Sequence, residues 1–90
     1  MTKVKICGIK TLQEAQYACD HGVWAIGEVF APSPRRITVE DARQINRRLN
    51  NSVLKIGVFV DETVQEVNRI ANICRLDMVQ LHGNETADYI

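Results

Sequence analysis

The sequence predicts an α/β fold that is built on a parallel sheet. Short runs rich in Val and Ile alternate with longer segments in which apolar residues recur every three or four positions. Hydroxyl residues that can cap a helix stand just before these longer segments. Strands that alternate with helices predict parallel pairing through right-handed crossovers, and 90 residues allow one domain only.

Each predicted element has local signals at its ends. The strands are expected at residues 4–9, 25–30, 53–60 and 77–83. The helices between them are expected to begin at Thr11, Thr38 and Thr63, each followed by an acidic residue three positions later. A fourth helix would start at residues 84–86. We therefore expect residues 1–90 to form a single (βα)4 unit, truncated within or just after the start of its fourth helix.

Two architectures fit this order of elements. One is an open, flavodoxin-like sheet with helices on both faces, but a site for a phosphorylated ligand there calls for a phosphate loop, and the sequence holds no GxGxxG or GK[ST] motif. The other is half of a (β/α)8 barrel, which as a whole usually needs about 250 residues. Half a barrel exposes its inner sheet face and two strand edges, so we expect such a chain to self-associate through the open inner sheet face, most simply as a dimer.

Composition excludes several classes of function. Lys+Arg and Asp+Glu are both 11, which argues against a nucleic-acid binder that works by charge. There is neither a signal-peptide pattern nor an apolar run near the roughly 20 residues that span a membrane. The three cysteines form no CxxC pair, and His21 and His82 have no cysteine at zinc-like spacing. We expect a reduced, cytoplasmic protein without nucleic-acid or membrane partners.

Four residues are candidates for a site at the carboxyl ends of the strands, where both architectures place their active sites. Cys7 ends the first strand, where it is either a base or nucleophile or a buried small hydrophobe. Arg35 follows the second strand and either binds a carboxylate or is a solvated loop arginine. Gln80 and His82 share one face of the fourth strand, where they either line a site or form a structural hydrogen-bond pair.

Four motifs occur together and in order: VKICGI at residues 4–9, FAPSPR at 30–35, IGVFV at 56–60 and VQLHG at 79–83. In these motifs the chain resembles phosphoribosylanthranilate isomerase of tryptophan biosynthesis. The resemblance runs through essentially all 90 residues. It implies the amino-terminal half of that family's TIM (β/α)8 barrel.

The resemblance also implies a reaction and roles. The family carries out an Amadori rearrangement of N-(5-phosphoribosyl)anthranilate to the carboxyphenylamino-deoxyribulose phosphate, without cofactor or metal. Cys7 matches the general base, Arg35 the arginine that positions the anthranilate carboxylate, and Gln80 and His82 residues near the pocket. The general acid and the phosphate site belong to the other half of the barrel. We therefore expect no significant isomerase activity from these residues alone. The alternative is a non-catalytic, self-associating half-barrel module.

Two local departures from the family pattern lie in or near the second strand. Residues 22–24 are Gly-Val-Trp where the family usually has Gly-Ala-Asp, and Glu28 stands where a Phe is usual. A buried, unpaired carboxylate is costly. We therefore expect Glu28 to face solvent or a new interface, or to pair with a lysine such as Lys5 or Lys55.

Overall fold

The computed structural model describes residues 3–49 and 53–82. Within them, four parallel strands form one sheet in the order β1-β2-β3-β4. The strands are β1 (Lys5–Cys7), β2 (Ala25–Val29), β3 (Leu54–Val60) and β4 (Met78–His82), and the helices are α1 (Leu12–Asp20), α2 (Val39–Arg48) and α3 (Val64–Cys74). The predicted fourth helix falls at residues 83–90, outside the described residues.

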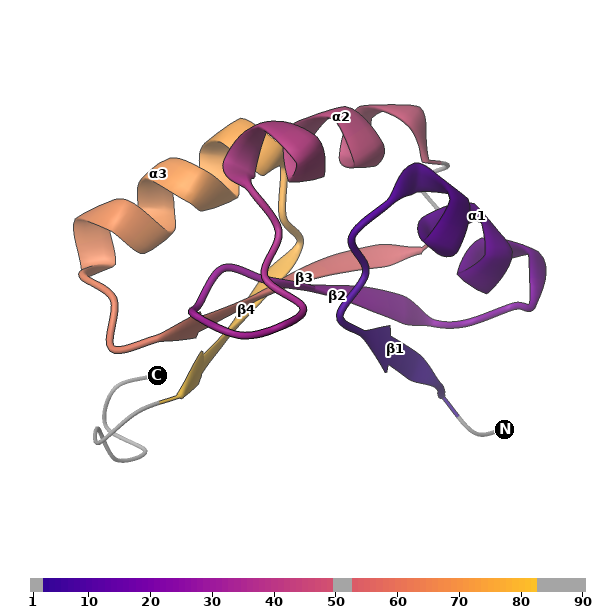
Figure 1. Ribbon diagram of the computed structural model, residues 1–90, viewed down its shortest axis with the longest axis horizontal. Coiled ribbons are helices and arrows are strands. Elements are labelled where there is room, and N and C mark those ends of the chain that lie inside the picture. The colour runs from indigo at the N-terminus through magenta and orange to yellow at the C-terminus, as the bar shows by residue number, and fades with distance from the viewer. Residues whose placement is uncertain (1–2, 50–52, 83–90) are drawn as a thin grey trace.

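The helices α1, α2 and α3 all lie on the same face of the sheet (Figure 1). A doubly wound sheet would carry helices on both faces, so the half-barrel interpretation is confirmed and the open-sheet alternative is wrong. The core fills the space between the helices and the sheet; its members include Ile26 and Phe59 from the sheet and Ala15, Ile45 and Ile70 from the helices.

The sheet is strongly curved. Lys5 of β1 donates from Nζ to Oε1 of Gln80 on β4 at 2.5 Å, although β1 and β4 are the two edge strands of the sheet. In a flat sheet their backbones would lie about 14 Å apart, three strand spacings, and side chains standing upright would not meet. The contact therefore identifies the face opposite the helices as concave, as in a closed barrel.

The concave face is less open than a cut barrel would suggest. Ile56 and Val58 of β3 point into it and are 3% and 8% exposed. Lys5 and Gln80 meet across this face, so the middle strands are shielded. Among the exposed large apolar residues, Val60 and Met78 point into the concave face at the ends of their strands, whereas Ile6 and Val79 point the other way on the two edge strands.

Threonine caps begin the helices where the sequence predicts them. The side chains of Thr11, Thr38 and Thr63 accept from the backbone N–H three residues later. The first strand, in contrast, is shorter than predicted. It ends at Cys7 because Gly8 turns the chain with φ of +86°, a left-handed conformation that glycine adopts without strain.

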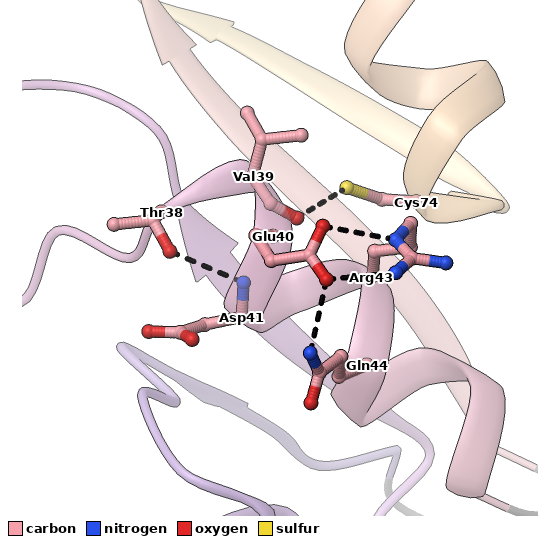
Figure 2. A network of polar contacts seen from close by, with 7 residues as sticks. All are labelled: Thr38, Val39, Glu40, Asp41, Arg43, Gln44 and Cys74. Atoms are coloured by element: carbon pink, nitrogen blue, oxygen red, sulfur yellow. Dashed lines mark hydrogen bonds and ion pairs between the residues drawn. The ribbon is translucent and has the colours of Figure 1, made fainter.

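A polar network joins the start of α2 to the end of α3 (Figure 2). Arg43 donates to Glu40 through Nε and Nη2, and Gln44 donates to the same carboxylate. These bonds, led by that of Arg43, lower the pKa of Glu40 to about 2. The thiol of Cys74 points at the carbonyl oxygen of Val39 at 3.4 Å, and this contact ties the two helices together.

The expectation that Glu28 faces solvent or a new interface is wrong. Its side chain is fully buried on the helix-facing side of β2, where Nδ2 of Asn46 donates to Oε1 at 2.9 Å and also to the carbonyl oxygen of Cys74. Burial raises the pKa of Glu28 to about 7, although Asn46 and Lys55 act in the opposite direction. Lys5 is not its partner, because it projects from the concave face. An amide from α2, not solvent or a new interface, accommodates this carboxyl.

Candidate active site

Cys7 lies at the carboxyl end of β1 and projects from the concave face. Its neighbour in the register is Gly27 of β2. A Cβ at position 27 would lie only 2.8 Å from Sγ of Cys7, so the missing side chain makes room for the thiol. Cys7 is exposed, whereas Cys74 is buried and its burial raises its pKa to about 11. The alternative of a buried hydrophobe therefore describes Cys74, not Cys7.

Arg35 lies in the loop between β2 and α2 and reaches back to the segment that follows Cys7. Its Nε donates to the carbonyl oxygen of Gly8 at 2.9 Å, and its Nη2 donates to Oε2 of Glu14 at 3.0 Å. A Cβ at Gly8 would lie 3.2 Å from Nε and 3.3 Å from Cγ of Arg35. The arginine therefore packs against the backbone of the residue next to Cys7.

Cys7 and Arg35 line the same hollow, whose volume is about 450 Å³. It opens beside β1, which is an edge strand, and its apolar wall, from Ile6 and Ile9 together with Tyr17 of α1, lies on the helix-facing side, where a barrel would continue. The structure thus brings a thiol and a guanidinium together after the carboxyl ends of β1 and β2. Such a set can bind an aromatic carboxylate and accept a proton from a group attached to it.

Gln80 and His82 are placed differently. Gln80 projects from the concave face of β4 and accepts from Lys5, two residues before Cys7 on the same strand. It does not line the hollow that holds Cys7 and Arg35. The backbone of His82 pairs with Val60 at the carboxyl end of β4, and its side chain lies outside the described part of the structure.

Two polar residues near the candidates were not predicted from the sequence as site residues. Lys5 could have been found by strand alternation, since it shares a face with Cys7. Glu14 is recognisable in the sequence only as a capping residue. The N–H of Lys10 and the guanidinium of Arg35, in that order, lower its pKa. No local pattern predicts the contact with Arg35, because it joins residues 21 positions apart.

Among residues 3–49 and 53–82, no three His, Cys, Asp or Glu side chains lie together in a way that could hold a metal ion. The helices in this part of the chain are too short or too polar to cross a membrane.

Comparison with known proteins gives one consistent family. The family described as N-(5'phosphoribosyl)anthranilate (PRA) isomerase matches residues 4–90. The N-(5'-phosphoribosyl)anthranilate isomerase of Syntrophomonas wolfei is 60% identical over 90 residues, which are 100% of this chain and 44% of the relative. That of Syntrophus aciditrophicus is 48% identical over 99% of this chain and 39% of its own length. The chain thus spans less than half the length of the curated relatives it matches.

Solved structures agree with the sequence matches. Phosphoribosyl anthranilate isomerase from Thermotoga maritima superposes with a TM-score of 0.94 at 43% identity, over 98% of this chain and 43% of that one. The Thermus thermophilus enzyme gives a TM-score of 0.91 at 44% identity, over 98% of this chain and 44% of its own. With a family match over nearly every residue and the same half-barrel geometry, this chain belongs to the phosphoribosylanthranilate isomerase family.

Proposed function

We propose that this chain is the amino-terminal half of a phosphoribosylanthranilate isomerase, and that it supplies the general base and the carboxylate-binding arginine. The observation that carries the proposal is the hydrogen bond from Nε of Arg35 to the carbonyl oxygen of Gly8, which holds the arginine beside Cys7 at the carboxyl ends of neighbouring strands. A related structure is a complex with reduced 1-(o-carboxyphenylamino)-1-deoxyribulose 5-phosphate, a molecule that carries an aromatic carboxylate of the kind an arginine binds.

The proposed reaction is an isomerisation in which one proton leaves C2 of the sugar. An acid first protonates the ring oxygen, and the ribose ring opens to an iminium ion. The Cys7 thiolate then takes the C2 proton, and the resulting enolamine tautomerises to the C2 ketone. Arg35 meanwhile binds the anthranilate carboxylate through N–H groups not engaged by Gly8 or Glu14. We further propose that Gln80 and His82 contribute to the pocket from β4 once the second half of the barrel completes it, although Gln80 does not line the hollow beside Cys7 in this half.

We further propose that these 90 residues have no significant isomerase activity by themselves. The acid that opens the ring and the site for the phosphate would come from the other half of the barrel. Loss of a general acid typically costs about 10²–10⁴-fold in rate. Loss of the phosphate contacts further removes binding energy that orients the substrate.

A second candidate function is that of a self-associating module. The exposed apolar side chains on β1 and β4 support it, because they lie where a barrel would continue. A Thermotoga maritima relative is dimeric, although its interface need not be the one proposed here. The location that we propose is the cytoplasm, since Cys7, Cys19 and Cys74 are free thiols, as in proteins of reducing compartments.

Complementation with a carboxyl-terminal half tests both functions. The chain is mixed with, or fused to, the second half of the Thermotoga maritima enzyme, and substrate loss is followed by anthranilate fluorescence. We expect turnover in the assembly and none above background from the chain alone. Cys7→Ala should abolish turnover, while Cys19→Ala on α1 should retain it. An assembly that folds but turns over no substrate would contradict the isomerase proposal and favour the non-catalytic module.

A further inference from the structure

Glu14 makes contacts that join two loops of the candidate site. It occupies the third position of α1, where its N–H donates to Oγ1 of the Thr11 cap at 3.1 Å. Its Oε1 accepts from the backbone N–H of Lys10 at 2.7 Å, and its Oε2 accepts from Nη2 of Arg35 at 3.0 Å. One carboxylate therefore links the loop after β1 to the loop after β2.

Arg35 is held at two points, and both belong to the segment that follows Cys7. The second point is the carbonyl oxygen of Gly8, which accepts from Nε at 2.9 Å. Because Gly8 lacks a Cβ, the arginine stem rests on its backbone. The direction of the guanidinium is thus set relative to Cys7 by two hydrogen bonds from different nitrogens rather than by one.

Glu66 provides an internal comparison. It occupies the same position of α3, its N–H donates to the Thr63 cap at 3.1 Å, and its carboxylate accepts from Nε and Nη2 of Arg69. Arg69, however, lies only three residues later on the same helix. Both helices have a threonine cap and a glutamate that pairs with an arginine. Of the two glutamates, only Glu14 contacts a candidate site residue.

We propose that Glu14 is a positioning residue that aligns the Arg35 guanidinium with the carboxylate of an aromatic substrate. The inference rests on the proposed isomerase function. A guanidinium has five N–H donors. Gly8 and Glu14 take one each, which fixes the plane of the group and leaves the others to bind the substrate. Without Glu14 the group would rotate about the Gly8 contact, and substrate would have to order it on binding.

The test compares Glu14→Gln with Glu66→Gln in the complemented assembly. Glutamine keeps an oxygen for the N–H of Lys10, so the helix cap survives, but its amide nitrogen repels Nη2 of Arg35. For Glu14→Gln we expect KM to rise roughly two- to fivefold, the size set by an exposed ion pair, with kcat little changed. Glu66→Gln should leave both constants at the wild-type values, and both variants should melt at similar temperatures.

A second readout does not depend on turnover. The Nε–Hε signal of Arg35, assigned by its loss in Arg35→Lys, should shift and exchange faster with water in Glu14→Gln but not in Glu66→Gln. The inference would be overturned if the Arg35 signal or the KM were unchanged in Glu14→Gln. A lower KM in Glu14→Gln would also overturn it, because Glu14 would then compete with the substrate for Arg35. If the wild-type assembly shows no turnover, the isomerase proposal fails, and the Arg35 signal still decides whether Glu14 orients the arginine.

Discussion

At the scale of single residues, Gly27 shows how an absent side chain shapes the candidate site. A Cβ at this position would meet Sγ of Cys7 at 2.8 Å and the backbone of Cys7 at 3.2 Å. The first distance is too short for real atoms, so either the thiol or the strand must shift. Gly27 therefore leaves the space that the thiol of Cys7 occupies.

We predict that Gly27→Ala destabilises the chain by about 1–3 kcal/mol, the usual effect of overpacking. In a Cys7→Ala background the cost should be smaller, because the sulfur is gone and only the approach to the backbone of β1 remains. Urea unfolding at fixed protein concentration measures the two differences as a double-mutant cycle. Equal costs in both backgrounds would mean that the thiol does not occupy the space that Gly27 leaves.

The residues of the candidate site differ in how far local sequence could predict them. Cys7 and Arg35 lie at strand ends, and strand ends follow from the alternation of strands and helices. The setting of Glu28 could not be predicted in this way. It depends on Asn46, which is 18 positions away on another element, and on the depth of burial under α2 and α3. Both are properties of tertiary packing.

At the scale of elements, Glu28 and Asn46 join β2 to α2 through an incompletely satisfied pair. In the described part of the chain, Oε2 of Glu28 and Oδ1 of Asn46 have no hydrogen-bond partner. A proton on Oε2 would make Glu28 a hydrogen-bond donor, and Oδ1 of Asn46 is the acceptor that still lacks a partner. A neutral carboxyl can thus satisfy both atoms, whereas an ionised one leaves both without a partner.

This pair predicts a dependence of stability on pH. The pKa of Glu28 is raised from 4.5 to about 7, first of all by burial, while Asn46 and Lys55 lower it; the thiol of Cys74 also lies close by. Between these two values the folded state binds more protons than the unfolded state, so stability falls as pH rises from 4.5 to about 7. The full loss is about 3 kcal/mol, and it stays constant above that range.

Glu28→Gln should remove this fall, because an amide satisfies Asn46 at every pH. Subtracting the urea-unfolding free energy of the variant from that of the wild type cancels the contributions of the other titrating groups. We expect the unfolding free energy of the wild type, relative to that of the variant, to fall as pH rises from 4.5 to 7 and then to level off. A flat difference over this range would show that Glu28 ionises in the folded state as it does in the unfolded one.

At the scale of the whole molecule, the sequence predicted the order and direction of the strands but left open which faces the helices cover. Periodicity marks an apolar stripe on a helix without saying on which side of a sheet it packs. Periodicity does not predict the curvature of the sheet either. It is visible in the contact between Lys5 and Gln80, which lie 75 positions apart.

That curvature decides where a second copy would bind. The middle of the concave face is shielded, whereas Ile6 of β1 and Val79 of β4, which point away from the concave face on the two edge strands, remain exposed. Unpaired strand edges with apolar side chains favour association with another edge. We therefore expect dimers to form through the edge strands, rather than by filling the concave face.

Val79→Lys tests this geometry, because Val79 is 38% exposed on β4 and points away from the concave face, and a lysine there resists burial. A buried valine contributes about 1.5–3 kcal/mol, so the dimer should dissociate at least tenfold more readily. Sedimentation velocity over a range of concentrations measures the change. Val64→Lys, at an even more exposed apolar position on α3, should leave the dimer intact. A wild-type chain that stays monomeric at every concentration would contradict self-association, and a dimer that Val64→Lys disrupts and Val79→Lys does not would place the contact elsewhere than on the strand edges.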